Sequence, residues 1–361
     1  MPCPSVHAAF YLWYGTPAFD GEWRHWDHPT LPHWDARVRA RFPPPGVRAT
    51  PPDKPHSPFY PDAGPYSSSD NATLRRQLSS LAAAGVDSVM LSWWGRADAA
   101  VTRDTQGVST DERVGAVLAA AAEAGVSVSW HLEPYGGRSP SSVALDLEYL
   151  HRTYGAHPAV WRQGGRPLVF LYDVSASHAP PHAAEWRQAL GGVRRTAADA
   201  VLLSLYLDER DVRFVEEAGF DGVYTYFAAD GFTQGSTPSH WPAARRRLAA
   251  AGKLFFPSVG PGYNDTLIRP WNGANSRPRR GGAYYDSMWR RALEVQPEGV
   301  TITSFNEWGE GTQIEPAAPH TAADGSVYDD YGEGGAAMYM EKTAEWRREA
   351  RRACGAQLDE L

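Results

Sequence analysis

The chain has 361 residues, 42% of them hydrophobic and 21% charged, which is typical of a globular protein that can bury a sizeable core. Its formal net charge of -7 provides no basic field for a phosphate backbone, so the composition argues against nucleic acid as a partner. The 14 tryptophans, 17 tyrosines and 12 phenylalanines make the chain rich in aromatic rings, which suit the flat faces and hydroxyl edges of sugars.

The two cysteines, Cys3 and Cys354, lie near opposite ends of the sequence, so the chain has no disulfide framework and no metal-type cysteine cluster. There is no apolar run long enough to span a membrane, and an apparent strand begins by about Ala8, which leaves no room for a signal peptide. We therefore expect no membrane segment, and either a cytosolic protein or one whose targeting segment is absent from this sequence.

Apolar runs rich in β-branched residues alternate with segments of helical spacing along the whole chain. Strands are predicted at residues 9–15, 86–94, 126–134, 167–173, 200–207, 222–227, 253–259 and 299–308. Helices are predicted at residues 72–84, 111–124, 141–154, 183–196, 209–218, 239–251, 284–295 and 336–354. Glycines close several of these helices, and Asp70 and Asp111 are predicted N-caps.

Strict alternation of eight strands and eight helices indicates an α/β fold with a parallel sheet. An open dinucleotide-binding sheet is disfavoured because no Gly-x-Gly-x-x-Gly turn follows the first strand. We predict a (β/α)8 TIM barrel, a single domain spanning residues 1–361, with long loops after its strands. The loop 16–69 is too aromatic for a flexible linker and is predicted to form a wall of the cleft, whereas the Gly-rich and acidic loop 316–335 is predicted to be mobile.

In such barrels the chemistry lies at the C-terminal ends of the strands. Seven of the predicted strands end in polar or aromatic groups, at residues 13–15, 92–95, 131–135, 172–173, 224–227, 261–263 and 306–308. These groups are expected to gather at one rim of the barrel.

Two glutamates, Glu307 and Glu310, follow the last predicted strand. In an extended chain residues three apart point to opposite faces, so their carboxylates converge only if the chain bends between them, and Gly309 is predicted to permit the bend. Paired carboxylates in a cleft are what glycoside hydrolysis needs, one to protonate the leaving oxygen and one to stabilise or generate the developing cation. The alternative is a pair of solvated surface acids, which the neighbouring aromatic residues disfavour.

Taken together, these motifs resemble glycoside hydrolase family 99, the endo-α-1,2-mannosidases and related bacterial endo-α-1,2-mannanases. The matching segments occur in one order over nearly the whole chain, at residues 10–15, 131–135, 224–227, 257–263, 268–272 and 304–314. The resemblance implies a (β/α)8 barrel that needs no cofactor and no metal. It also implies cleavage inside an α-mannoside chain or N-glycan with retention of configuration.

The resemblance further implies that Glu307 removes the proton from the 2-hydroxyl of the reacting sugar, whose oxygen then attacks C1 to give a 1,2-anhydro intermediate. Glu310 would be the general acid and then the base that activates water. A carboxylate nucleophile on C1 is the alternative mechanism. Residues that would line the sugar sites are Tyr14, His25, Trp94, Glu133, Tyr226 and Arg269. Ordinary loop or rim packing is the alternative for the histidine and the two tyrosines, and pairing with a loop carboxylate is the alternative for the arginine.

The expected substrate is a glucosylated high-mannose N-glycan, with unglucosylated mannan as the alternative. Trp94 resembles the bacterial mannanase-like members, whereas segments 305–308 and 226–228 resemble the animal enzymes, so the sugar at the −2 subsite stays open between glucose and mannose. Two other classes are a catalytically lapsed sugar-binding barrel and a metal enzyme that uses His25, His28 and His131. The resemblance places the protein in the Golgi lumen or outside the cell, and we expect a monomer.

Overall fold

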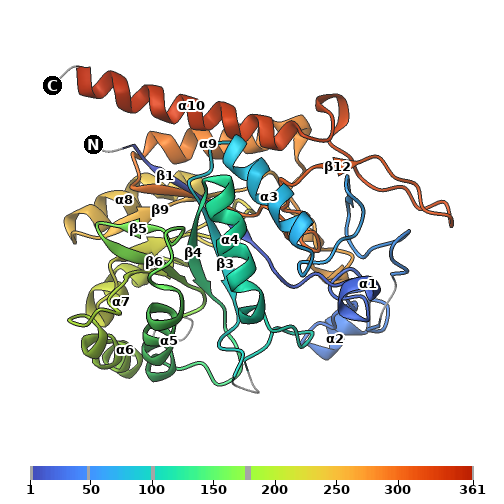
Figure 1. Ribbon diagram of the computed structural model, residues 1–361. Helices are drawn as coiled ribbons and strands as arrows, with labels where there is room; N and C mark the ends of the chain where they lie inside the picture. The colour runs from blue at the N-terminus through green and yellow to red at the C-terminus, as the bar shows by residue number, and fades with distance from the viewer. Residues whose placement is uncertain (1–2, 47–48, 99–101, 175–179, 360–361) are drawn as a thin grey trace.

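The computed structural model describes residues 3–46, 49–98, 102–174 and 180–359. Its centre is a ring of parallel strands with helices packed around the outside (Figure 1). In chain order the ring contains β1 (Ser5–Phe10), β3 (Ser88–Trp93), β4 (Ser127–Leu132), β6 (Arg166–Leu171), β7 (Val201–Leu205), β8 (Gly222–Tyr224), β9 (Leu254–Phe256), β10 (Ser258–Val259) and β11 (Gly299–Ile302). The predicted TIM barrel is therefore confirmed.

The ring closes through a strand that is interrupted at Pro257. The predicted seventh strand is split there into β9, which pairs with β8, and β10, which pairs with β11. Proline has no backbone N–H for the ladder, but the N–H of Thr301 donates to the Pro257 carbonyl at 3.1 Å and bridges the interruption. Because β11 also pairs with β1, the first and last strands lie side by side.

The main helices follow the strands in the predicted order and cover the outside of the barrel (Figure 1). They are α3 (Asn71–Ala83), α4 (Val114–Ala124), α5 (Pro140–Tyr154), α6 (Pro180–Val193), α7 (Arg210–Ala218), α8 (Trp241–Ala250), α9 (Ala283–Glu294) and α10 (Met338–Asp359). Short 3₁₀ helices occupy Asp111–Arg113, Pro238–His240, Pro270–Asn275, Arg280–Gly282 and Gly332–Gly334.

The predicted helix caps are partly confirmed. Asp70 caps α3 through bonds from two backbone N–H groups, and Gly125 and Gly219 end α4 and α7 in the left-handed conformation. Asp111 was predicted as a cap and is not one, because its buried carboxylate accepts from the Trp93 indole at 2.9 Å instead.

Two segments that lie far apart in the sequence meet beside the barrel. The first long loop carries α1 (Pro17–Asp20), α2 (Ala36–Arg39) and β2 (Tyr60–Pro61). β2 pairs antiparallel with β12 (Ala317–Ala318), while β5 (Arg162–Gln163) forms a hairpin onto β6. The mobility of loop 316–335 stays a prediction. Within the described ranges, no helix is both long enough and apolar enough to cross a membrane.

Candidate active site

A cleft of about 580 Å³ is lined by residues that follow the C-terminal ends of the barrel strands. Every one of the seven predicted strand-end segments contributes to it, through Trp13, Trp94, Glu133, Tyr172, Tyr226, Tyr263 and Glu307. Glu310 lines the same cleft. The two glutamates are therefore not a pair of solvated surface acids, and the predicted convergence of strand ends on one rim is confirmed.

A tight turn follows Glu307 and contains Glu310. β11 ends at Ile302 instead of the predicted residue 308, and the backbone turns where the Gly311 N–H donates to the Trp308 carbonyl at 3.1 Å. Gly311 carries the left-handed backbone angle, with φ of 62°. The prediction that Gly309 makes the bend by its freedom of rotation is wrong, because Gly309, unlike Gly311, does not have a positive φ. A Cβ at Gly309 would lie 2.6 Å from the Cδ1 atom of Ile268, so the glycine leaves room for the end of that side chain.

The floor of the cleft is tied to the end of β1 by Asn306. Its side-chain oxygen accepts from the Tyr11 N–H at 2.8 Å, and its amide nitrogen donates to the Tyr11 carbonyl at 3.0 Å. The Tyr14 hydroxyl donates to the Asn306 carbonyl at 2.8 Å and accepts from the Trp308 N–H at 3.0 Å. These bonds fix the backbone on both sides of Glu307.

A buried carboxylate, Glu315, supports the turn from behind. It accepts hydrogen bonds from the Tyr66 hydroxyl at 2.7 Å, the Gln77 amide at 2.7 Å and the Trp308 indole at 3.0 Å. Burial raises the pKa of Glu315, and these three donors oppose the shift by favouring the charged form. The fully buried Trp308 is thus held by its backbone and by its ring.

The two cleft glutamates have raised pKa values. Glu307 is 7% exposed, and burial, helped by the nearby charge of Glu310, raises its pKa well above the usual range. Burial also raises the pKa of Glu310, but Arg269 opposes that shift because its guanidinium donates to the Glu310 carboxylate at 3.2 Å. Arg269 also bonds Asp265 at 2.9 Å. A pair of this kind can keep one proton at a pH where isolated carboxylic acids are ionised.

Comparison with known proteins identifies the family. The sequence profile of glycosyl hydrolase family 99 matches residues 4–352. The chain is 40% identical to a mouse glycoprotein endo-α-1,2-mannosidase-like protein over 94% of this chain and 75% of that protein. It is 39% identical to rat glycoprotein endo-α-1,2-mannosidase, over 94% of this chain and 74% of that one.

A solved structure agrees. The GH99 endo-α-mannosidase from Bacteroides thetaiotaomicron superimposes with a TM-score of 0.86 and 40% identity, over 96% of this chain and 98% of that one. The chain belongs to glycosyl hydrolase family 99. It is a glycosidase, and the resemblance found in the sequence is confirmed.

Four of the predicted sugar-binding residues of this family 99 chain line the cleft beside the glutamates, namely Trp94, Glu133, Tyr226 and Arg269. The Glu133 carboxylate is fixed by the Ser92 hydroxyl and by the His131 ring, each at 2.8 Å. Tyr226 bonds through its hydroxyl to that of Tyr11. These side chains are therefore held in place before a sugar arrives.

Tyr14 and His25 are not among the residues that line the cleft. Both are buried, and His25 stacks on Trp13 with ring centroids 4.3 Å apart while its Nε2 lies 2.8 Å from Asp104. They support the wall from behind, through Trp13 and through Asn306, and direct contact with sugar stays a prediction for both.

The histidines of the metal alternative do not converge on one point. The two ring nitrogens of His131 form hydrogen bonds with the Glu133 carboxylate and with the Tyr224 hydroxyl, each at 2.8 Å. The Nε2 atom of His25 forms its hydrogen bond with Asp104 instead. Within the described part of the chain, no group of three or more histidine, cysteine or acidic side chains is placed to hold a metal ion.

Several cleft residues of this family 99 chain are missing from the predicted set. Tyr172 and Tyr263 lie in the predicted strand-end segments, so their position in the sequence was sufficient to predict that they line the cleft. Trp34 comes from an irregular loop and Trp271 from the short 3₁₀ helix Pro270–Asn275, and neither segment has a periodicity that indicates which way a side chain points.

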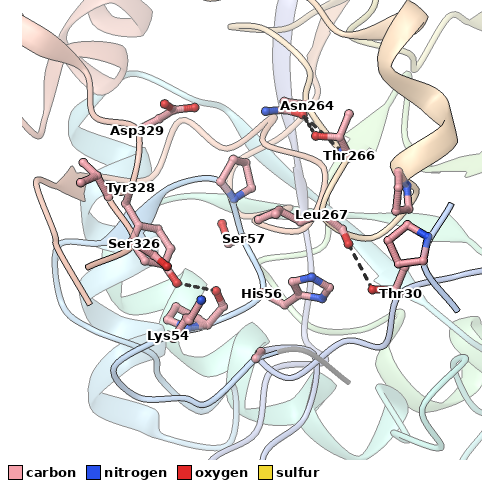
Figure 2. A pocket seen from close by; sticks show the side chains of 16 residues that line it. Thr30, Lys54, His56, Ser57, Asn264, Thr266, Leu267, Ser326, Tyr328 and Asp329 are labelled. Atoms are coloured by element: carbon pink, nitrogen blue, oxygen red, sulfur yellow. Dashed lines mark hydrogen bonds between the residues drawn. The ribbon is translucent and has the colours of Figure 1, made fainter. Parts of the chain in front are cut away.

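A second hollow, of about 490 Å³, adjoins the cleft and contains neither glutamate (Figure 2). Asn264, Thr266 and Leu267 line this hollow, whereas Arg269 and Trp271 line the cleft, so one segment separates the two. The first long loop is fastened to this segment, because the Leu31 N–H donates to the Ile268 carbonyl at 2.7 Å. Figure 2 shows a second bond nearby, from the Thr30 hydroxyl to the Leu267 carbonyl at 3.5 Å.

Proposed function

We propose that the chain is a retaining endo-α-1,2-mannosidase that cleaves inside an α-mannoside chain through a 1,2-anhydro sugar. The observation that carries the proposal is that Glu307 and Glu310 line one cleft together with Arg269 and Glu133. The names of the mouse and rat relatives, which specify an endo-α-1,2-mannosidase, support the type of bond. No residue of this scheme requires a cofactor.

In the first step, Glu307 takes the proton from the 2-hydroxyl and the freed oxygen attacks C1 on the face opposite the leaving group. The bond from C1 to the leaving oxygen breaks, and Glu310 supplies that oxygen with a proton. In the second step, Glu310 takes a proton from water, the water oxygen opens the epoxide at C1, and Glu307 returns its proton to the 2-oxygen. Two inversions at C1 give overall retention.

The electrostatics of the free site distinguishes the two acids. Burial raises the pKa of each carboxyl group, so one can carry the proton that a general acid needs at neutral pH. Arg269 contacts only one of them, Glu310, and favours its charged form. Sugar binding must therefore shift this contact or the proton before Glu310 can act as the acid.

Two synthetic substrates test the mechanism. A disaccharide fluoride needs no acid for departure of its leaving group, so Glu310→Gln should still release fluoride in a first turnover at close to the wild-type rate. Later turnovers should be slow because Glu310 also takes the proton from water in the second step, and an oligosaccharide should not be cleaved at all. Glu307→Gln should lose both activities. An oligosaccharide whose reacting 2-hydroxyl is replaced by hydrogen should not react at all, and its hydrolysis would instead support a carboxylate nucleophile on C1.

We propose a glucosylated high-mannose N-glycan as the substrate, with unglucosylated mannan as the second candidate because Trp94 lines the cleft. Incubation with both glycans followed by mass spectrometry separates these candidates. Release of a glucosyl-mannose unit supports the first, and release of a mannose disaccharide alone supports the second. No product from either glycan would favour a sugar-binding barrel without activity. We also propose a monomer, since one chain supplies both glutamates and their partners, and size-exclusion chromatography tests this.

A further inference from the structure

Two tryptophans form an aromatic platform at the edge of the cleft. Trp34 and Trp271 both line the cleft, with ring centroids 5.1 Å apart and planes at 79°. Trp34 is 80% exposed, the largest value among the exposed large hydrophobic residues of the described chain. An isolated exposed apolar residue needs no explanation, but this one stands at the edge of a cleft that holds two glutamates.

The platform is held in place by its neighbours. The His33 ring stacks on Trp34 with centroids 3.9 Å apart and also meets Trp271 edge-on at 4.7 Å. The His33 ring nitrogen accepts from the Asp35 N–H at 2.9 Å, and Asp35 in turn caps α2. An exposed ring that is already ordered loses little conformational entropy when a ligand covers it, which favours binding.

The platform lies near Glu310 along the chain. Trp271 is two residues from Arg269, whose guanidinium bonds the Glu310 carboxylate. Two residues span at most about 7 Å of backbone. Trp94 and Glu133, in contrast, follow β3 and β4. If Glu310 protonates the leaving oxygen, the platform belongs to the half of the cleft that receives the leaving group.

We propose that the aromatic platform of Trp34 and Trp271 is an outer subsite that binds a pyranose ring of the leaving-group part of the substrate. The apolar C–H face of the sugar would stack on the exposed face of the Trp34 indole. Asn272 and Asn275 line the cleft next to it and carry amides that suit sugar hydroxyls. The inference rests on the proposed function and adds to it a preference for substrates that extend beyond the cleaved bond.

The test compares two substrates that differ only on the leaving-group side. A disaccharide fluoride has no sugar there, whereas an oligosaccharide with two or more mannoses beyond the cleaved bond can reach the platform. Trp34→Ala should raise KM for the oligosaccharide roughly fivefold to tenfold, the size expected for one aromatic contact, with kcat unchanged. KM for the fluoride should stay within about twofold of the wild-type value.

Two further variants serve as controls. Trp34→Phe keeps a flat ring and should restore most of the affinity for the oligosaccharide. Phe19→Ala removes another exposed aromatic ring, which is 58% exposed and does not line the cleft. This variant should leave KM unchanged for both substrates. An unchanged oligosaccharide KM in Trp34→Ala, or an equal rise for both substrates, would overturn the outer subsite.

The failure of the subsite can be told apart from the failure of the proposed function. If the wild-type chain turns over neither substrate, the proposed function fails. The platform is then tested alone by calorimetric titration of mannotriose into wild type and Trp34→Ala. Binding about fivefold to tenfold weaker in the variant supports the platform, and equal binding overturns it.

Discussion

The floor and the edge of the cleft are built in opposite ways. Beneath the floor, on either side of the cleft residue Glu307, Asn306 and Trp308 are fully buried and bonded through both backbone and side chain. At the edge, Trp34 and Phe232 come from loops and are 80% and 43% exposed. The difference teaches that chemistry and recognition are separated in space, so floor variants should change kcat and edge variants should change KM.

The largest expected effect comes from the glutamates themselves. Glu307→Gln and Glu310→Gln should each reduce kcat on an oligosaccharide by roughly a thousandfold or more, because each removes a carboxyl group that transfers a proton in both steps. Oligosaccharide binding, measured by calorimetry, should survive in both variants. Substantial turnover in both would contradict the assignment of the floor as the site of chemistry.

Arg269→Ala should reduce kcat by roughly tenfold to a hundredfold, since it removes the partner of Glu310. It should also move the pH profile. Arg269 lowers the pKa of Glu310, so its removal raises that pKa. The acid must be protonated to act, so the alkaline limb of kcat/KM should shift to higher pH. Arg246→Ala, at an exposed position of α8, is the matched control, and a shift to lower pH would show that Glu310 is not the acid.

Glu315→Ala should lower the free energy of unfolding by about 3 kcal/mol, because it leaves three buried donors without an acceptor. Glu315→Gln keeps one acceptor oxygen and should lower the free energy of unfolding by less. In the folded state the pKa of Glu315 is raised, so its contribution to stability falls as pH rises above the ordinary carboxyl range. Urea unfolding should therefore show a gap between wild type and Glu315→Gln that narrows from low pH towards neutrality, and a widening gap would contradict this.

The smallest effect on kinetics is expected from Phe232, at the exposed edge of the cleft. Phe232→Ala removes a half-exposed ring that contacts Phe227 with centroids 4.9 Å apart. KM should rise by no more than about threefold, with kcat and the melting temperature unchanged, because the ring is already largely in water. A fall in kcat for Phe232→Ala would contradict the expectation that edge variants change KM alone.

The sequence contained enough information for the barrel and for the glutamate pair. Strand number follows from alternating apolar runs, and Glu307 and Glu310 are close enough in sequence to be recognised together. The interruption at Pro257 was missed because the apolar run continues through it. Glu315 was missed because its partners Tyr66 and Gln77 lie 249 and 238 residues away, and no local pattern encodes such contacts.

The amide of Asn306 joins two pieces of chain that are 295 residues apart. During synthesis the segment around Tyr11 leaves the ribosome long before the segment around Asn306, so this hydrogen bond can form only after the strands between them have been made. Contacts between residues so far apart in sequence form late in folding, because the entropy cost of closing the intervening loop precedes the stabilisation that the contact provides. Sugar cleavage can thus begin only once the barrel has closed, so a chain truncated before β11 would be inert even where its earlier strands had folded.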